Sequence, residues 1–122
     1  MLRPWKKAVQ SPLKPRSQRP LSHCRGLWMV VGVMELTLAV PAGSLKEKRS
    51  IIRKIMGRTR SKFPISIGEV AEQDTPSTVV LGVAFVSAEA RLVEQVLMKV
   101  ERFIEELMLA EPFDRFVKLE YY

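Results

Sequence analysis

The hydrophobic positions of this 122-residue chain become regular only after residue 28. Residues 30–40 alternate, with one parity wholly apolar and the other mixed, which predicts a strand in a sheet covered on one side. Residues 64–71 and 78–86 predict two more strands, of which the second is rich in β-branched residues and apolar on both faces. Residues 115–121 alternate again, so we expect them to form a fourth strand.

A first helix is predicted between the first two strands. Ser44 is followed three residues later by Glu47, which is the spacing of a capping box. Apolar residues then recur at helical spacing as far as Phe63, and Pro64 disfavours the helical conformation at the residue before it.

A second helix is predicted between the third and fourth strands. Ser87 is its expected N-cap, its apolar stripe runs from Leu92 to Leu107, and Pro112 is expected to end it. The resulting β-α-β-β-α-β order, with right-handed crossovers, predicts an α+β ferredoxin-like sandwich. In that fold an antiparallel sheet of order 4-1-3-2 carries both helices on one face.

Residues 1–28 differ in composition from the rest of the chain. They contain four prolines, seven basic residues and no acidic residue, and they lack apolar periodicity. We predict a disordered basic tail, because such a segment cannot bury enough surface to offset the entropy of ordering. It could be an arm that contacts nucleic acid, a targeting segment, or the front of a signal peptide, although the apolar run that follows continues into a strand. The simplest interpretation is that Met29 is the true start and that residues 29–122 form the domain.

The net charge of +7 lies entirely in that tail, since residues 29–122 contain 20 − 7 = 13 basic and 13 acidic residues. Within the domain, residues 45–62 carry eight basic residues and one acid, whereas residues 89–111 carry six acids and three basic residues. A cationic stripe on a helix can follow a phosphate backbone, although most such faces are simply solvated. The candidate RNA-binding residues are Lys46, Lys48, Arg49, Arg53 and Arg60.

Catalytic chemistry has few candidates in this chain. His23 and Cys24 are the only residues of their types, there is no Asn, and no phosphate-binding glycine loop occurs. We therefore expect no enzyme activity, no metal and no cofactor. Glu35 and Glu69 are expected on the helix-free face of the sheet, where they could hold a divalent ion or, more simply, form salt bridges.

The helix-free face is also predicted to expose apolar side chains. Val31 and Val33 on the first strand, with Leu81 and Val83 on the third, are the candidate interface residues. Because an exposed apolar patch commonly marks an interface, a homodimer formed by two sheets packing face to face is expected.

Four segments resemble the YlxP-like family, also called domain of unknown function 503, over residues 29 to about 110. They are MVVGVMELTLAVP, SLKEKR, FPISIGEVAEQD and LGVAFVS, and the SLKEKR and E-V-x-x-Q-D runs are the most specific. The resemblance implies a ferredoxin-like fold without an established activity. The bacterial genes of the family often lie beside those for translation initiation and ribosome-binding factors, which implies a cytoplasmic role near the ribosome.

Together these features suggest a non-enzymatic cytoplasmic accessory protein that binds ribosomal RNA or a ribonucleoprotein through its first helix. The alternative is a homodimeric protein–protein interaction module with no nucleic-acid role, in which the basic helix meets an acidic partner. No stretch of the sequence is apolar and long enough for a membrane span.

Overall fold

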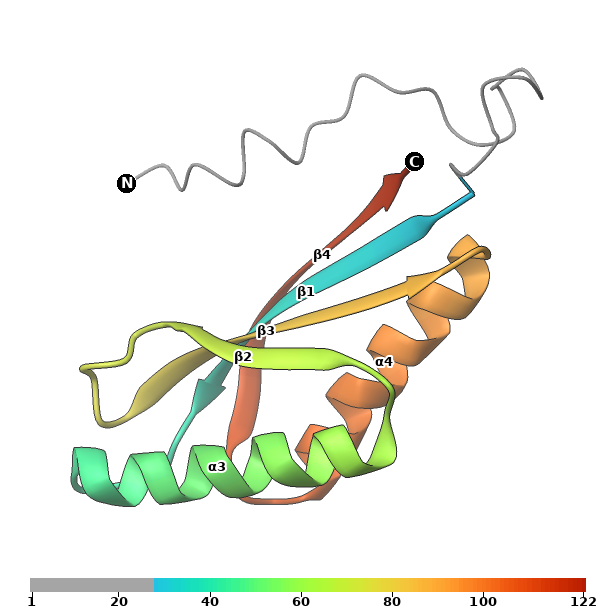
Figure 1. The fold of residues 1–122 in the computed structure, drawn as a ribbon. Helices are drawn as coiled ribbons and strands as arrows, with labels where there is room; N and C mark the ends of the chain where they lie inside the picture. The colour runs from blue at the N-terminus through green and yellow to red at the C-terminus, as the bar shows by residue number, and fades with distance from the viewer. Residues whose placement is uncertain (1–27) are drawn as a thin grey trace.

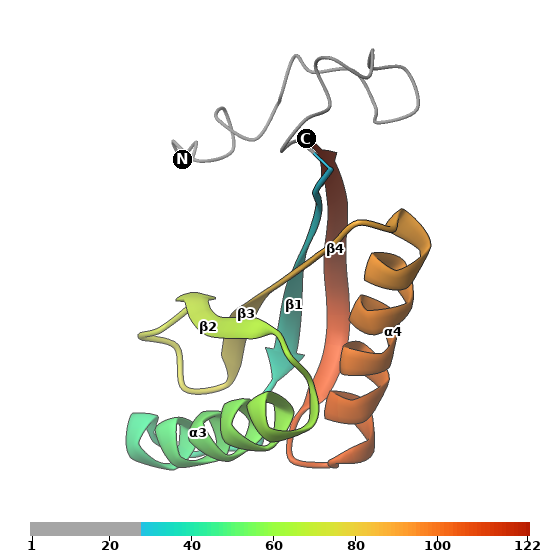
Figure 2. The ribbon, with the colours of Figure 1, turned by 45° about the vertical axis from the view of Figure 1, so that its right-hand side comes forward.

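The computed structural model describes residues 28–122, and their elements follow the predicted β-α-β-β-α-β order (Figure 1). The strands are β1 (Val30–Ala39), β2 (Ser66–Ala71), β3 (Thr78–Ser87) and β4 (Glu111–Tyr121), and the helices are α3 (Leu45–Lys62) and α4 (Ala90–Glu106). The strands form one antiparallel sheet of order β2-β3-β1-β4. Both helices lie on the same face of this sheet (Figure 2), so the predicted ferredoxin-like sandwich is confirmed. The predicted tail lies outside the described residues, apart from Trp28.

The core lies between the sheet and the two helices. β1 contributes the side chains of its alternate residues, of which Met34, Leu36 and Leu38 are almost completely buried. The helices contribute their apolar stripes to the same cluster, namely Ile52 and Ile55 of α3 and Val93, Leu97, Val100 and Ile104 of α4.

Gly32 marks the place where α4 comes closest to β1. A Cβ atom at this position would lie 2.2 Å from Cγ1 of Val93 and 2.9 Å from Cδ1 of Leu97. A glycine is therefore favoured here, because the side chains of Val93 and Leu97 occupy the space that a Cβ atom would need.

The N-terminus of α3 carries the predicted cap. The Ser44 hydroxyl accepts a hydrogen bond from the Glu47 backbone N–H at 3.2 Å. The Glu47 carboxylate accepts one from the N–H of Gly43 at 3.3 Å, one residue before the usual donor of a capping box. Two of the donors at this helix end are thereby satisfied by side chains.

The boundaries of α4 differ from the prediction. Ser87 does not cap the helix, because the N-cap is Glu89 and the Ser87 hydroxyl accepts only from the Glu89 N–H, at 3.3 Å. The helix ends at Glu106, and Met108 then adopts a positive φ of 60°. Pro112 therefore does not end the helix but lies near the start of β4, where an edge strand tolerates a missing N–H.

Candidate nucleic-acid interface

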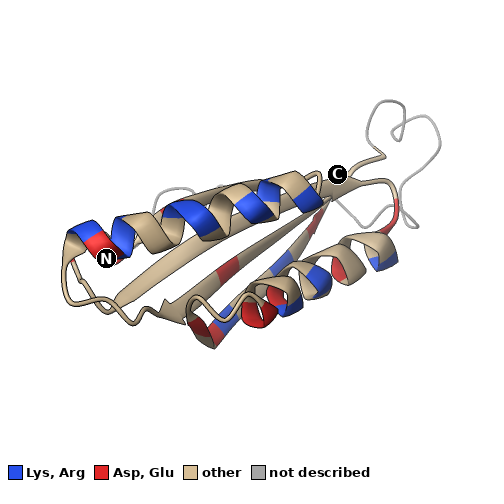
Figure 3. Ribbon diagram, turned by 90° about the horizontal axis from the view of Figure 1, so that it is seen from below, with Lys and Arg blue, Asp and Glu red and all other residues tan. Residues whose placement is uncertain are grey.

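Basic residues recur along the whole of α3, where Lys and Arg are blue segments of the ribbon in Figure 3, and all but Lys48 are exposed. The helix buries one side against the sheet, through Lys48, Ile52, Ile55 and Thr59. Seven cations are exposed to solvent, namely Lys46, Arg49, Arg53, Lys54, Arg58, Arg60 and Lys62. The only acid on this helix is Glu47, whose carboxylate is engaged at the cap.

Lys48 is not part of this exposed face, so its assignment as an RNA-binding residue was wrong. Its side chain is only 1% exposed, and its ammonium donates hydrogen bonds to the backbone carbonyls of Glu72 and of Thr75, the latter at 2.6 Å. The Glu69 carboxylate lies 3.9 Å away. The sequence held a signal for this position, because Lys48 precedes Ile52 by four residues and Ile55 by seven and so shares their face.

The contacts of Lys48 join the two most specific sequence runs of the chain. The loop between β2 and β3 turns at Glu72, whose φ is 60°, and the Glu72 carboxylate accepts a hydrogen bond from the Thr75 hydroxyl at 3.1 Å. Gln73 donates from its side-chain amide to the Glu69 carbonyl at 3.3 Å. SLKEKR and E-V-x-x-Q-D thus meet at a clamp between α3 and this loop.

Arg60 and Lys62 are exposed but already have contacts within the domain. A terminal nitrogen of Arg60 donates to the Ile67 carbonyl of β2 at 2.9 Å. The Lys62 ammonium lies 4.8 Å from the centroid of the Phe103 ring, which packs edge-on against Phe63. These contacts fix the C-terminal end of the basic helix against β2 and α4.

The remaining cations of α3 have no such contacts. These five residues are Lys46, Arg49, Arg53, Lys54 and Arg58. None of them makes an ion pair or a side-chain hydrogen bond with another of residues 28–122. Lys54 and Arg58 were not among the predicted RNA-binding residues, although their exposure on the same helix makes them equally accessible. Because like charges three or four residues apart on a helix repel each other, these cations do not stabilise α3.

The two predicted carboxylates do not share a face. Glu69 lies opposite Leu81, on the face covered by the helices, and it was wrongly expected on the helix-free face. Glu35 lies opposite Gly82 and Phe116. Within the described residues, no group of three or more potential metal-ligating side chains lies close together.

The residues of β3 that lie on the helix-free face are not the ones predicted, because the predicted set faces the helices. Leu81 and Val83 are 0% and 3% exposed, because they belong to the core, and their assignment as interface residues was wrong. Val31 and Val33 lie on the helix-free face opposite Val86 and Ala84 and are partly buried. The apolar side chains that β3 presents on this face are therefore Val80, Ala84 and Val86, and the face-to-face homodimer stays a prediction.

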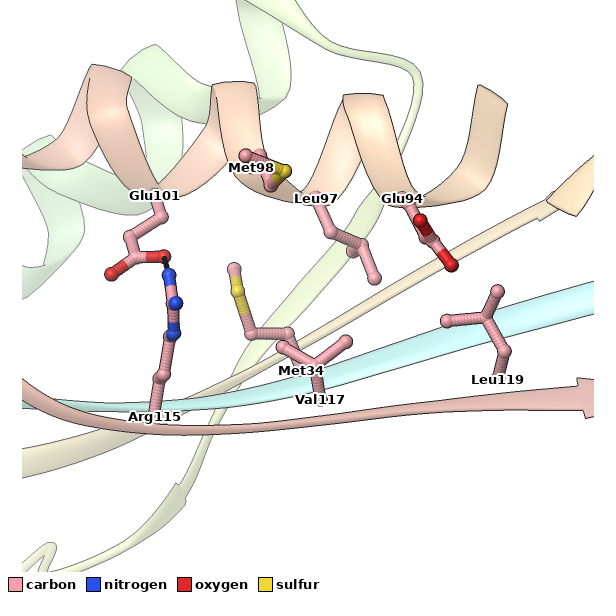
Figure 4. A pocket seen from close by; sticks show the side chains of 8 residues that line it. All are labelled: Met34, Glu94, Leu97, Met98, Glu101, Arg115, Val117 and Leu119. Atoms are coloured by element: carbon pink, nitrogen blue, oxygen red, sulfur yellow. Dashed lines mark hydrogen bonds and ion pairs between the residues drawn. The ribbon is translucent and has the colours of Figure 1, made fainter. Parts of the chain in front are cut away.

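A groove of about 400 Å³ lies between α4 and β4 (Figure 4). Its floor includes Met34, Val117 and Leu119, and its rim carries an ion pair between Arg115 and Glu101 at 2.5 Å. The groove lies on the flank of α4 away from α3, so it does not contribute to the basic surface. No helix within residues 28–122 is long and apolar enough to cross a membrane.

Comparisons with known proteins agree with the sequence resemblance. Residues 31–115 match the model of a family described as a protein of unknown function (DUF503). The uncharacterized protein YlxP of Bacillus subtilis (strain 168) is 42% identical over 64 residues, which cover 52% of this chain and 70% of that protein. Two solved structures are similar in part: the de novo designed protein Foldit4 and the designed ferredoxin-fold protein LFR1 1. Foldit4 has a TM-score of 0.47 and 14% sequence identity, and the match covers 77% of this chain and 98% of that protein. LFR1 1 has a TM-score of 0.45 and 19% sequence identity, and the match covers 73% of this chain and 84% of that protein. On the extent of the family match, this chain belongs to the DUF503 family of proteins.

Proposed function

We propose that this protein is a non-enzymatic cytoplasmic accessory factor that binds RNA, or a ribonucleoprotein, through the exposed face of α3. The observation that carries the proposal is the set of five exposed cations that have no partner among residues 28–122. A helix that places so many like charges together without internal neutralisation is suited to an external polyanion.

The arrangement favours the backbone of a single strand or a folded RNA over base-specific recognition. The described part of α3 presents charges and no exposed aromatic side chain on which a base could stack. Affinity should therefore come from phosphate contacts and should fall steeply as salt is added. If about four cations contact phosphates of single-stranded RNA, the logarithm of the association constant should fall with a slope near −3 against the logarithm of salt concentration.

Fluorescence anisotropy with a labelled single-stranded RNA tests this proposal. The variant Lys46→Gln/Arg49→Gln/Arg53→Gln should bind at least about tenfold more weakly and show a shallower salt slope. A matched control is Arg91→Gln/Lys99→Gln/Arg102→Gln, which removes the same charge from exposed positions of α4 and should bind nearly as the parent does. Equal losses in both variants, or binding that does not depend on salt, would contradict a role for α3.

The alternative function is a protein–protein interaction module in which the basic helix meets an acidic partner. The basic face itself supports it, since the same cations would pair with carboxylates. Co-sedimentation with ribosomal particles at low and at high salt separates the two functions. Release at high salt supports RNA binding by α3, whereas absence from the particles at low salt favours the acidic protein partner.

A further inference from the structure

The two edges of the sheet differ in how they are protected. β2 is a short strand with a register shift between Glu69 and Ala71, and its outward Ile67 carbonyl accepts a hydrogen bond from Arg60. β4 is 11 residues long with a register shift between its partners Thr37 and Leu38, and its regular part from Asp114 onward has no neighbouring strand on its other edge among the described residues. Exposed edges of this length usually carry charges, bulges or a covering element, because they otherwise template pairing with another chain.

Exposed apolar side chains lie along β4 between its charged residues, on both faces of the sheet. Phe113, Phe116 and Val117 are 61%, 48% and 42% exposed, and Met98 on the adjacent flank of α4 is 60% exposed. Val117 and Met98 line the groove described above (Figure 4). Exposed aromatic, Met and β-branched residues gathered along one strand are typical of an interface.

The hydrogen-bond pattern identifies which backbone groups this edge offers. The Tyr122 N–H donates to the carbonyl of Met29, the residue before β1. In this antiparallel ladder the backbone groups of the even-numbered residues from 114 to 122 therefore point toward β1. The N–H and C=O groups of Arg115 and Val117 therefore point to the free edge. Consistent with this, the Arg115 N–H donates to the side chain of Asp114, at 2.9 Å.

We propose that the free edge of β4 binds the β4 edge of a second copy of this chain, antiparallel and with Phe116 on the twofold axis. This register pairs residues 114–118 of the two chains with each other, within the part of β4 that lies on the C-terminal side of its register shift. Arg115 and Val117 of each chain then exchange backbone hydrogen bonds with Val117 and Arg115 of the other. The two sheets join into one, and the two α4 grooves come to lie on the same face of it.

Charge complementarity selects this register over its neighbours. With Phe116 on the axis, Asp114 lies opposite Lys118 of the other chain, twice by symmetry. A shift of the axis to residue 115 would place Arg115 against Arg115, and a shift to residue 117 would place Asp114 against Glu120. Like charges directly opposite each other destabilise a strand pair, so only the Phe116 register among these three is free of repulsion.

The inference does not depend on RNA binding, since α3 contacts β2 through Arg60 and the strand order places β4 at the opposite edge of the sheet from β2. Sedimentation or light scattering of the full chain should give twice its mass of 13.9 kDa in the micromolar range. Asp114→Lys and Lys118→Asp should each weaken the dimer at least about tenfold, because each turns two attractive pairs into two repulsive pairs. An equimolar mixture of the two variants should form a heterodimer, in which both pairs are again of opposite charge.

A matched control is Asp74→Lys, which makes the same charge change in the exposed loop between β2 and β3 and should leave the dimer intact. Recovery of the heterodimer also shows that both single variants fold. The proposal is overturned if the parent chain is a monomer, if neither single substitution weakens the dimer, or if the mixture does not associate. It is equally overturned if the dimer resists both substitutions but is lost in Val33→Glu, because the helix-free face would then be the interface.

Discussion

Lys48 offers the most direct test of how this domain holds its β2–β3 loop. We predict that Lys48→Met lowers the free energy of unfolding, although methionine keeps most of the apolar stem of lysine. The ammonium is almost fully buried and donates to the carbonyls of Glu72 and Thr75. Methionine would leave the Thr75 carbonyl without its donor, and would leave the Glu72 carbonyl only the long 3.4 Å contact from the Thr75 N–H.

The size of the effect follows from two opposing terms. Each hydrogen bond from a charged group stabilises by roughly 1.5–3 kcal/mol. Part of this gain is offset, because keeping an ammonium ion buried costs several kcal/mol that methionine does not incur. We therefore expect a net loss of about 2 kcal/mol, which corresponds to roughly 8–16 °C in the melting temperature of a domain of this size.

Urea unfolding followed by circular dichroism measures this loss at fixed protein concentration. Lys46→Met is the matched control, because it makes the same chemical change two residues away at an exposed position and should alter stability by less than about 0.5 kcal/mol. Hydrogen exchange of the amides of residues 72–77 should also accelerate in Lys48→Met. If that variant were as stable as the parent and its loop equally protected, the clamp would have no energetic role and the reasoning would be refuted.

Three further substitutions test the packing of α4 on β1, the helix propensity of α3 and the cap of α3 by the same unfolding measurement. Gly32→Ala should destabilise by about 1–3 kcal/mol, because its Cβ would overlap Val93 and Leu97, and a neutral result would contradict the close approach of α4 to β1. Gly57→Ala, on the exposed side of α3 with nothing within 4 Å, should instead stabilise by up to about 1 kcal/mol. Ser44→Ala should cost about 1 kcal/mol through loss of the cap, and an unchanged stability would show that solvent replaces it fully.

The order of elements was predictable because it depends on short-range patterns. The alternation in β1 and the capping residues Ser44 and Glu47 are read within a few positions of the chain. The ends of α4 were less predictable. Ser87 and Pro112 have the right chemistry to cap and to end a helix, yet the chain leaves the helix earlier, at Met108, and Pro112 lies on an edge strand where its missing N–H costs little.

The basic surface was predictable in part. Lys46, Arg49 and Arg53 are exposed on α3 as their helical positions predict. Charge alone misplaced Lys48, because a charged residue on an apolar stripe can either be excluded from the core or be satisfied inside it. The carbonyl acceptors that decide this belong to Glu72 and Thr75, 24 and 27 residues along the chain.

The sequence by itself determined the succession of strands and helices, the fold class and the separation of charge between α3 and α4. Only the tertiary structure decided which parity of β3 faces the core, because a strand that is apolar on both sides contains no information about which side the helices cover. Leu81 and Val83 are buried since the register with β1 sets them opposite Leu36 and Met34. The same long-range pairing leaves β4 at the edge of the sheet that residues 28–122 form.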